Sequence, residues 1–209
     1  EILDAQDESL DDGVLGHENH KYVIGIDTAL ATDEFVETVL DITEKPYQTV
    51  RQVAAKGNSK SPQMHLNDFV DLYNSYSNDT NSNITVLLET WNGESARFYQ
   101  DLPPYIQQNT YCYGSWQPAK NLASDNKNPI VRKTNQIKKA DILLALKKLL
   151  SARELKIPKN SPVLTQQLSI YKEDDDKIPT DRVISLALAS WMALEQEQKK
   201  VQQWQAVEW

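Results

Sequence analysis

Short apolar runs separated by turn-forming residues dominate the first half of the chain. Three of them, at residues 22–27, 35–42 and 47–54, are typical of β-strands. The first run is largely apolar up to its final residue, which favours a central strand buried on both faces. The short links between the runs predict an antiparallel meander. Further runs at residues 84–89 and 110–113 predict a fourth and a short fifth strand.

Apolar residues at helical spacing predict the helices. One helix is expected at residues 63–76 and a second at about 94–107, interrupted by Pro103 and Pro104. The long final helix begins near Thr180, a plausible N-cap. A short element at 154–157 and a helical turn at 163–169 precede it. The amphipathic helix at 136–151 is expected to bury Ile137, Ala140, Leu143, Leu144, Ala145 and Leu150.

The order of these elements, β-β-β-α-β-α-β-α-α, indicates the fold class. It matches a ribonuclease H-like α/β domain, in which a mixed five-stranded sheet carries helices on both faces. In such a sheet the first and fourth strands lie side by side. We expect this domain to span residues 21–209, and residues 1–20 to form an acidic, flexible linker or tail.

Three acidic residues stand at the ends of predicted elements that are far apart in the chain. Asp27 closes the first strand, Glu89 closes the fourth, and Asp181 opens the last helix. Because strands one and four are neighbours in the predicted sheet, Asp27 and Glu89 are expected to meet. Each acid alone also fits an ordinary role as a strand end, a surface acid or a helix cap. Acids at all three places favour one shared site.

Carboxylates gathered in this way suit Mg²⁺ or Mn²⁺, which prefer oxygen ligands. A pair of such ions can activate water and neutralise the charge that builds on a phosphate during phosphodiester cleavage. We therefore predict catalytic and metal-binding roles for Asp27, Glu89 and Asp181, with two ions bound and Asp27 bridging them. Asp33, six residues after Asp27, is a candidate supporting or fourth acid, and fits a turn acid equally well.

Charge is unevenly distributed along the chain. The net charge is -8, but residues 1–20 hold seven acids and no Lys or Arg, whereas residues 117–160 hold eleven Lys or Arg and three acids. A basic segment on a near-neutral body fits a polyanion, and fits a solvated helix surface as well. Lys138 is also a candidate to approach the metal site. Predicted contacts to DNA phosphates are Arg132, Lys133, Lys138 and Lys139.

Several other chemistries are disfavoured. The single cysteine, Cys112, excludes an internal disulfide, favours a reducing setting and lacks an obvious catalytic partner. Three His and one Cys do not make an ordinary structural zinc site. There is no glycine-rich phosphate loop ending in Lys-Ser or Lys-Thr. No apolar run approaches the roughly 18 residues of a membrane span, so no membrane association is predicted.

Several segments resemble the C-terminal nuclease domain of viral large terminase subunits. Tyr22-Val-Ile-Gly-Ile-Asp27 with Asp33 looks like the opening of that domain, and Leu87-Leu-Glu89 followed by Asn92-Gly93 is similar to its second acidic motif. The third motif resembles Pro179-Thr-Asp181 and the Ala/Leu-rich helix after it, although the family often has two adjacent acids here. Its late region resembles Lys138 with the apolar helix that follows, Glu154-Leu-Lys-Ile-Pro158 and Leu164-Thr-Gln-Gln-Leu168.

The resemblance covers about residues 21–195 and implies a specific activity. It implies a divalent-metal-dependent endonuclease, a hydrolase that cuts concatemeric double-stranded viral DNA during genome packaging in tailed bacteriophages. The implied partners are DNA, an ATPase domain N-terminal to this one in the same protein, the portal and the small terminase subunit. The implied location is the host cell cytoplasm.

Two other functions remain open at this stage. A junction resolvase or transposase-type nuclease of the same fold would prefer branched DNA to linear duplex. A non-catalytic packaging-motor interaction module would bind no divalent ion at the three acids. A sugar-kinase or chaperone-type ATP-binding domain can share the strand order, but it needs glycine-rich phosphate-binding turns, and the chain has six glycines with no suitable cluster.

Overall fold

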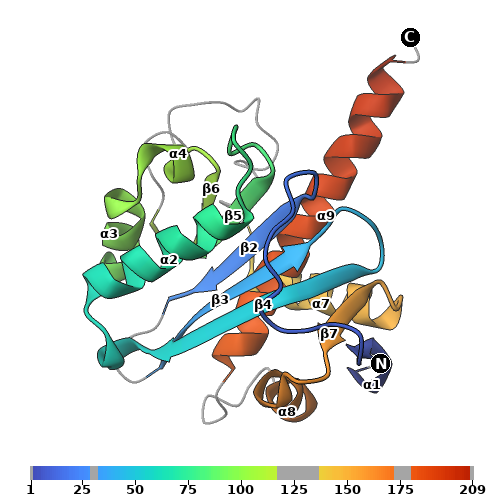
Figure 1. Ribbon diagram of the computed structural model, residues 1–209, viewed down its shortest axis with the longest axis horizontal. Helices are drawn as coiled ribbons and strands as arrows, with labels where there is room; N and C mark the ends of the chain where they lie inside the picture. The colour runs from blue at the N-terminus through green and yellow to red at the C-terminus, as the bar shows by residue number, and fades with distance from the viewer. Residues whose placement is uncertain (1, 29–32, 117–136, 172–179, 208–209) are drawn as a thin grey trace.

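The computed structural model describes residues 2–28, 33–116, 137–171 and 180–207, with side chains up to residue 199. A mixed sheet runs through the described residues, flanked by helices on both faces (Figure 1). Its seven strands have the order β1-β7-β4-β3-β2-β5-β6. Their bounds are β1 Gln6–Asp7, β2 Tyr22–Asp27, β3 Glu34–Asp41, β4 Tyr47–Lys56, β5 Ile84–Glu89, β6 Thr110–Tyr113 and β7 Leu155–Pro158.

The centre of the sheet confirms the predicted order. Strands β2, β3 and β4 form an antiparallel meander, and β5 pairs with β2 in parallel, with Ile26 opposite Leu88. All six residues of β2 are buried, as expected for a strand covered on both faces. The neighbouring β2 and β5 therefore end side by side, at the edge of the sheet where Asp27 and Glu89 lie.

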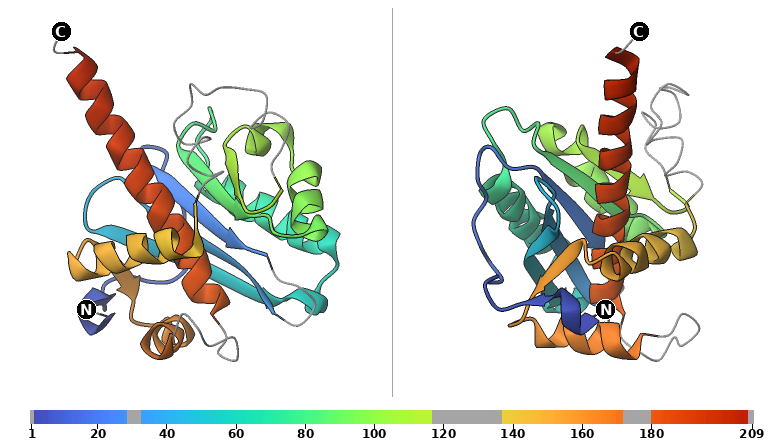
Figure 2. Two further views of the ribbon diagram at one scale, coloured as in Figure 1. Left: turned by 180° about the vertical axis from the view of Figure 1, so that it is seen from behind. Right: turned by 90° about the vertical axis from the view of Figure 1, so that its right-hand side faces the viewer.

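Two helical layers cover the sheet, and each has its own hydrophobic core. On one face lie α2 (Pro62–Tyr76), α3 (Gly93–Asp101) and α4 (Pro104–Gln107). On the other lie α7 (Lys139–Ser151) and the long α9 (Asp181–Val207), which crosses the sheet and projects beyond it (Figure 2). The predicted helices on both faces are confirmed. The shorter elements are α1 (Ile2–Ala5), the 3-10 helix η1 (Gly57–Ser59) and α8 (Pro162–Ile170).

Helix α9 packs directly on the backbone of β2. The Ser185 hydroxyl donates to the Gly25 carbonyl oxygen at 2.9 Å and lies 2.8 Å from the Thr38 hydroxyl oxygen. A Cβ atom added to Gly25 would lie 2.1 Å from the Ser185 carbonyl oxygen and 2.6 Å from the Ala189 nitrogen. Such distances are far below van der Waals contact, so this close approach of helix to strand requires glycine.

The prediction of five strands is wrong, because two more strands extend the sheet beyond β4. The short element predicted at 154–157 is strand β7, which pairs in parallel with β4, and β1 pairs in parallel with β7. Four residues carry too little alternation to identify a strand from sequence. The open edge of β4 supplies the backbone partners that make β7 a strand.

The acidic N-terminal segment lies along the domain. Ala5 is buried in the core beside β7, and the backbone N–H groups of Gly13 and Gly16 donate to the carbonyl oxygens of Val50 and Ser75. Residues 2–20 thus lie against the body of the domain, and their division from residues 21–209 as a linker or tail stays a prediction. Some of their acids pair with basic residues of the body, such as Asp4 with Arg153. A connection to a further domain stays a prediction.

Helix α7 confirms only part of the predicted face: Ala145 and Leu150 are buried, and Leu143 is partly buried against the same core. Ile142, Ala145, Leu146, Leu149 and Leu150 are buried, whereas Leu144 is 65% exposed. The buried positions follow the i, i+3, i+4, i+7 spacing of one helical stripe. This helix has enough leucines for two overlapping stripes, and its packing against α9 selects one of them.

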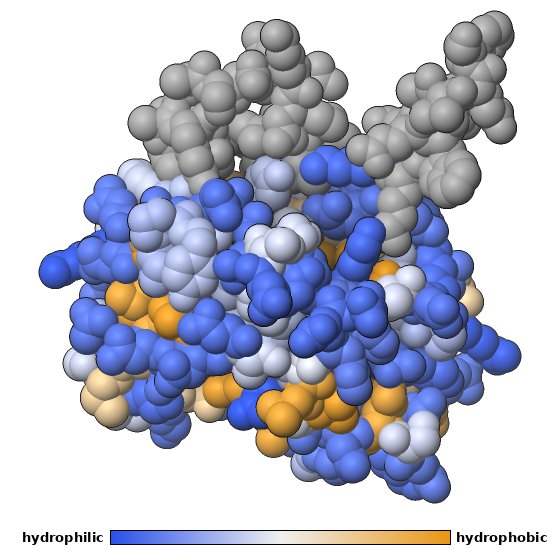
Figure 3. Space-filling model, turned by 45° about the horizontal axis from the view of Figure 1, so that its top comes forward, coloured by the Kyte–Doolittle hydropathy of each residue, from blue (hydrophilic) through white to orange (hydrophobic). Residues whose placement is uncertain are grey.

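The outer surface is largely hydrophilic, with small and separate hydrophobic patches in the view of Figure 3. Among the described residues, no helix is long and apolar enough to cross a membrane. The large apolar side chains are instead gathered in the two cores on either side of the sheet.

Replacement of Gly25 tests the close approach of α9 to β2. We expect Gly25→Ala to lower the free energy of unfolding by about 1–3 kcal/mol, because the new methyl group forces the helix away from the strand. Urea denaturation measures this change. Gly93→Ala is the matched control, since a Cβ there meets nothing within 4 Å. Equal stability of the two variants would contradict the packing described above.

Candidate active site

Asp27 and Glu89 meet at the end of two adjacent parallel strands. The register of β2 with β5 runs from Tyr22 opposite Ile84 to Ile26 opposite Leu88, so each acid follows the last of these pairs. Side chains alternate along a strand, and both carboxyl groups point to the face that carries α7 and α9. Asp27 is only 8% exposed, and Glu89 is partly buried. The structure places Asp27 and Glu89 side by side, as the sequence predicts.

The two carboxyl groups are hydrogen-bonded to each other. Two carboxylates repel each other in such a contact, which favours the protonated form of Asp27. Burial raises the pKa of Asp27 well above its ordinary value, and the charge and hydrogen bond of Glu89 raise it further. Asp181 raises the pKa of Asp27 to a smaller degree, and Lys139 lowers it. Positive charge near Asp27 is therefore insufficient to offset its burial beside a second acid.

Asp181 is fixed at the start of α9 by contacts with β3. Its carboxylate accepts a hydrogen bond from the Glu34 backbone N–H at 3.0 Å. The next residue, Arg182, donates from Nε to the Glu34 carboxylate at 3.1 Å, and its backbone N–H donates to the side-chain oxygen of Gln167. This network places the first turn of α9 beside the end of β2, which explains why the charge of Asp181 reaches Asp27.

Burial raises the pKa of Asp181, and the negative charges of Asp33 and Glu34 raise it further. The Glu34 N–H and the Arg182 guanidinium act in the opposite direction. Asp33 is exposed, and its backbone carbonyl accepts a hydrogen bond from the Gly57 N–H at 2.8 Å. Asp33 therefore influences the site through Asp181, as a neighbouring charge just before β3.

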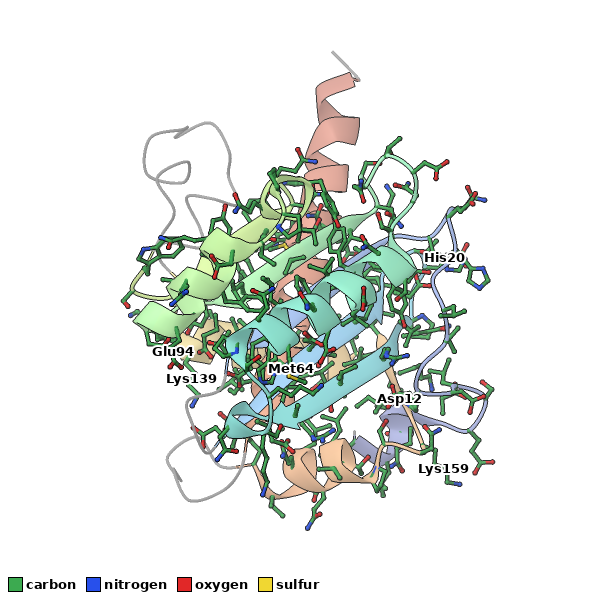
Figure 4. The ribbon with its side chains drawn as sticks, turned by 60° about the vertical axis from the view of Figure 1, so that its left-hand side comes forward. Asp12, His20, Met64, Glu94, Lys139 and Lys159 are labelled. Atoms are coloured by element: carbon green, nitrogen blue, oxygen red, sulfur yellow. The ribbon has the colours of Figure 1, made fainter. Side chains whose placement is uncertain are left out.

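Of the four basic residues predicted to contact DNA phosphates, Lys138 and Lys139 lie within the described residues. Lys139 is the exposed first residue of α7 and acts electrostatically on Asp27. Lys138 is exposed just before this helix, where its backbone N–H donates to the Asp141 carboxylate at 2.8 Å. Arg132 and Lys133 lie outside the described residues. Figure 4 shows Lys139 on the same side of the molecule as Glu94, in the first turn of α3.

Three residues near the acids escaped the sequence-based prediction. Tyr113 lies opposite Glu89 in the register of β5 with β6, and burial, Glu89 and Asp141 together raise the pKa of Tyr113 to about 12. Asp141 lies in the first turn of α7, and Thr28 donates its hydroxyl hydrogen to the Glu89 carbonyl oxygen at 3.3 Å. Asp141 had a visible signal, since it stands three residues after Lys138 at a capping-box position.

The acids do not form a complete set of metal ligands as they stand. Among the residues that the structure describes, no group of three or more His, Cys, Asp or Glu side chains is arranged to hold a metal ion. Asp27 and Glu89 are in contact, whereas the Asp181 carboxylate is hydrogen-bonded to the backbone of β3. A buried carboxyl pair with too little positive charge around it nevertheless fits a divalent cation. The carboxyl groups offer oxygen ligands, and the ion would supply the positive charge that the surroundings lack.

The raised pKa of Asp27 predicts how stability depends on pH in the absence of metal. Since the folded chain raises the pKa of Asp27, the folded state binds more protons than the unfolded state above pH 4, and stability falls as pH rises. We expect Asp27→Asn to be more stable than the wild type at pH 8 in EDTA, by on the order of 1 kcal/mol or more.

Urea denaturation at several pH values measures this difference, which should shrink toward pH 4. The control is Asp71→Asn, which changes an exposed acid on α2 and should not alter the pH dependence. A stability gap for Asp27→Asn that is absent at pH 8, or grows toward pH 4, would contradict the raised pKa of Asp27.

Comparison with known proteins gives structural matches only. No known protein family matches the sequence, and no curated protein matches it. The structure is similar to the large terminase nuclease of thermophilic phage G20c in crystals with bound zinc (TM-score 0.60, 17% identity) and with bound magnesium (TM-score 0.60, 15% identity). The match with bound zinc covers 90% of this chain and 94% of the other, and the match with bound magnesium covers 90% and 93%.

Two further structures extend this result. The large terminase nuclease domain of Thermus phage P74-26 matches with a TM-score of 0.58 and 16% identity, over 90% of both chains. The whole large terminase of another thermophilic bacteriophage matches with a TM-score of 0.55 and 12% identity, over 90% of this chain but 44% of that one. These are the proteins that the sequence motifs resemble. The chain has the fold of phage large terminase nuclease domains.

Proposed function

We propose that this chain is a divalent-metal-dependent endonuclease that cuts concatemeric double-stranded viral DNA during genome packaging. The observation that carries the proposal is the buried Asp27–Glu89 carboxyl pair at the ends of adjacent parallel strands, with Asp181 close enough to act on it. The fold shared with phage terminase nucleases supports the proposal.

Asp27, Glu89 and Asp181 are the residues that would hold Mg²⁺ or Mn²⁺ in this proposal, with Asp27 between two ions. Such ions, when bound, supply a hydroxide-like nucleophile and the positive charge that a cleaving phosphate requires. Loss of the Asp27 proton must accompany binding, because a proton on this carboxyl group occupies a lone pair that a cation needs. The terminase nuclease of phage G20c crystallised with magnesium or zinc agrees with a carboxylate site of this kind.

Other residues of the chain have supporting roles in the proposal. Glu34 and Arg182 hold Asp181 at the start of α9, and so position it rather than react. Lys139 stands beside Asp27 and is a candidate to hold a DNA phosphate, as are Lys138, Arg132 and Lys133. Asp33 and Asp141 add negative charge at the margin of the site, which favours cations there.

The partners are proposed from the same likeness. The match to a whole large terminase spans less than half of that protein, and one crystal of it was obtained with ADP. We propose that this nuclease domain works with an N-terminal ATPase domain in the same protein. The portal and the small terminase subunit are further proposed partners, in the cytoplasm of the host cell.

Cleavage of supercoiled plasmid DNA tests the proposed activity. We expect nicked and linear DNA to appear with Mn²⁺ or Mg²⁺ and not in EDTA. Asp27→Ala should reduce the rate at least about 100-fold, because loss of a metal ligand costs more than the 10–100-fold typical of its supporting residues. Asp71→Ala is the control, since it removes an exposed acid on α2 and should leave the rate unchanged. Circular dichroism checks that both variants are folded.

The same experiment separates the alternatives. Equal cleavage by the wild type and Asp27→Ala would end the assignment of the site. A strong preference for branched over linear DNA would favour a junction resolvase or transposase-type nuclease. Calorimetric titration with Mn²⁺ that detects no binding by the wild type would favour a non-catalytic interaction module.

A further inference from the structure

Trp91 is an exposed tryptophan two residues after the candidate metal ligand Glu89. Trp91 is 53% exposed, although it is one of the largest apolar side chains in the chain. An indole ring left in water forgoes the stabilisation that burial would give. Single exposed apolar residues need no special explanation, so the surroundings of Trp91 decide whether its exposure has a purpose.

The backbone around Trp91 is held firmly. The Thr90 N–H donates to the Tyr113 carbonyl oxygen at 2.6 Å, and the Trp116 N–H donates to the Thr90 carbonyl oxygen at 3.1 Å. The Thr90 hydroxyl reaches the Trp116 carbonyl oxygen at 2.8 Å, and the Ser115 hydroxyl donates to the Trp91 carbonyl oxygen at 3.1 Å. The loop after β5 is therefore tied to the segment after β6 on both sides of Trp91.

Gly114 allows the two segments to approach this closely. Its φ of +141° suits glycine, and an added Cβ would lie 2.6 Å from the carbonyl carbon of Thr90. The Trp91 ring itself packs edge-to-face on Tyr113, with ring centroids 5.4 Å apart and planes at 83°. The indole is thus anchored on one side while about half of the side chain remains exposed, so the ring is held in a set orientation.

The anchored ring lies beside the acids. Trp91 is two residues after Glu89, so their Cα atoms are at most about 7 Å apart. Its packing partner Tyr113 is the residue opposite Glu89 in the sheet. Trp91 thus flanks the acid pair on the β6 side, and Lys139 acts on the same pair from the start of α7.

We propose that Trp91 binds the DNA substrate by stacking its indole on a nucleobase next to the bond that is cut. The proposal rests on the proposed endonuclease function and assigns a DNA contact beyond the acids and the basic residues. Stacking of an aromatic ring tolerates any base, which suits cleavage with little sequence preference. Bases in an intact duplex are covered by their neighbours, so the preferred partner is a base at an unpaired or distorted step.

Binding of DNA measures the contact without cleavage. The probe is a fluorescein-labelled duplex with a short unpaired bulge, titrated in EDTA and followed by anisotropy. We expect Trp91→Ala to weaken binding about tenfold, in the range of aromatic–base stacking, and Trp91→Phe to retain affinity within about threefold. Leu3→Ala is the matched control, because Leu3 is 79% exposed on α1 at the opposite edge of the sheet, and its variant should bind as the wild type does.

Two further readouts distinguish a DNA contact from a structural role. In plasmid cleavage, Trp91→Ala should raise KM about tenfold and change kcat less than about threefold. The chain has five tryptophans, and DNA should quench part of their fluorescence in the wild type. Trp91→Phe should lose that quenching while it still binds DNA, because the indole that stacks on the base has been replaced by a phenyl ring.

The outcomes separate this inference from the proposed function. Unchanged affinity in Trp91→Ala, together with unchanged quenching in Trp91→Phe, would overturn the stacking contact and point to a protein partner for the indole. Wild-type protein that shows Trp91-dependent quenching but never cleaves would retain the contact and end the endonuclease assignment. Wild-type protein that binds no DNA would overturn both.

Discussion

The arrangement of this domain depends on the close contact between helix α9 and strand β2. Only a residue without a side chain permits the distance at Gly25, where Ser185 bonds to the strand backbone. This contact fixes the path of α9 across the sheet, and the bonds of Asp181 and Arg182 to Glu34 fix where the helix begins. Asp181, the third acid, is therefore placed by contacts with residues that lie more than a hundred positions earlier in the sequence.

The same packing creates an electrostatic conflict at the edge of the sheet. Hydrophobic cores on both faces bury the ends of β2 and β5, and those ends carry carboxyl groups that repel each other when ionised. A fold seldom keeps two buried acids in contact for stability alone. Perturbed carboxyl groups of this kind cluster at functional sites, and the nearby cations, Lys139 above all, offset only part of the cost.

Much of the fold followed from local patterns. The meander, the strand that ends at Glu89 and the final helix were predicted because long apolar runs and clear turn residues mark them. Strand β7 could not be recognised as a strand from sequence, because its four residues form one only by pairing with the open edge of β4. The buried face of α7 was predicted only in part, because leucines at 143, 144 and 146 are compatible with more than one stripe. Which stripe is buried depends on the element that packs against the helix, and a local sequence pattern does not identify that element.

For the candidate site, the sequence by itself determined the identity of the acids and the elements that carry them. It placed Asp27 and Glu89 at the ends of two strands, and backbone register then made them neighbours. Only the tertiary structure decided that Asp27 is buried in contact with Glu89, that Asp181 is bonded to β3, and that Trp91 is anchored on Tyr113. Sequence spacing specifies which end of an element a residue occupies, whereas burial and hydrogen bonding depend on which elements pack together.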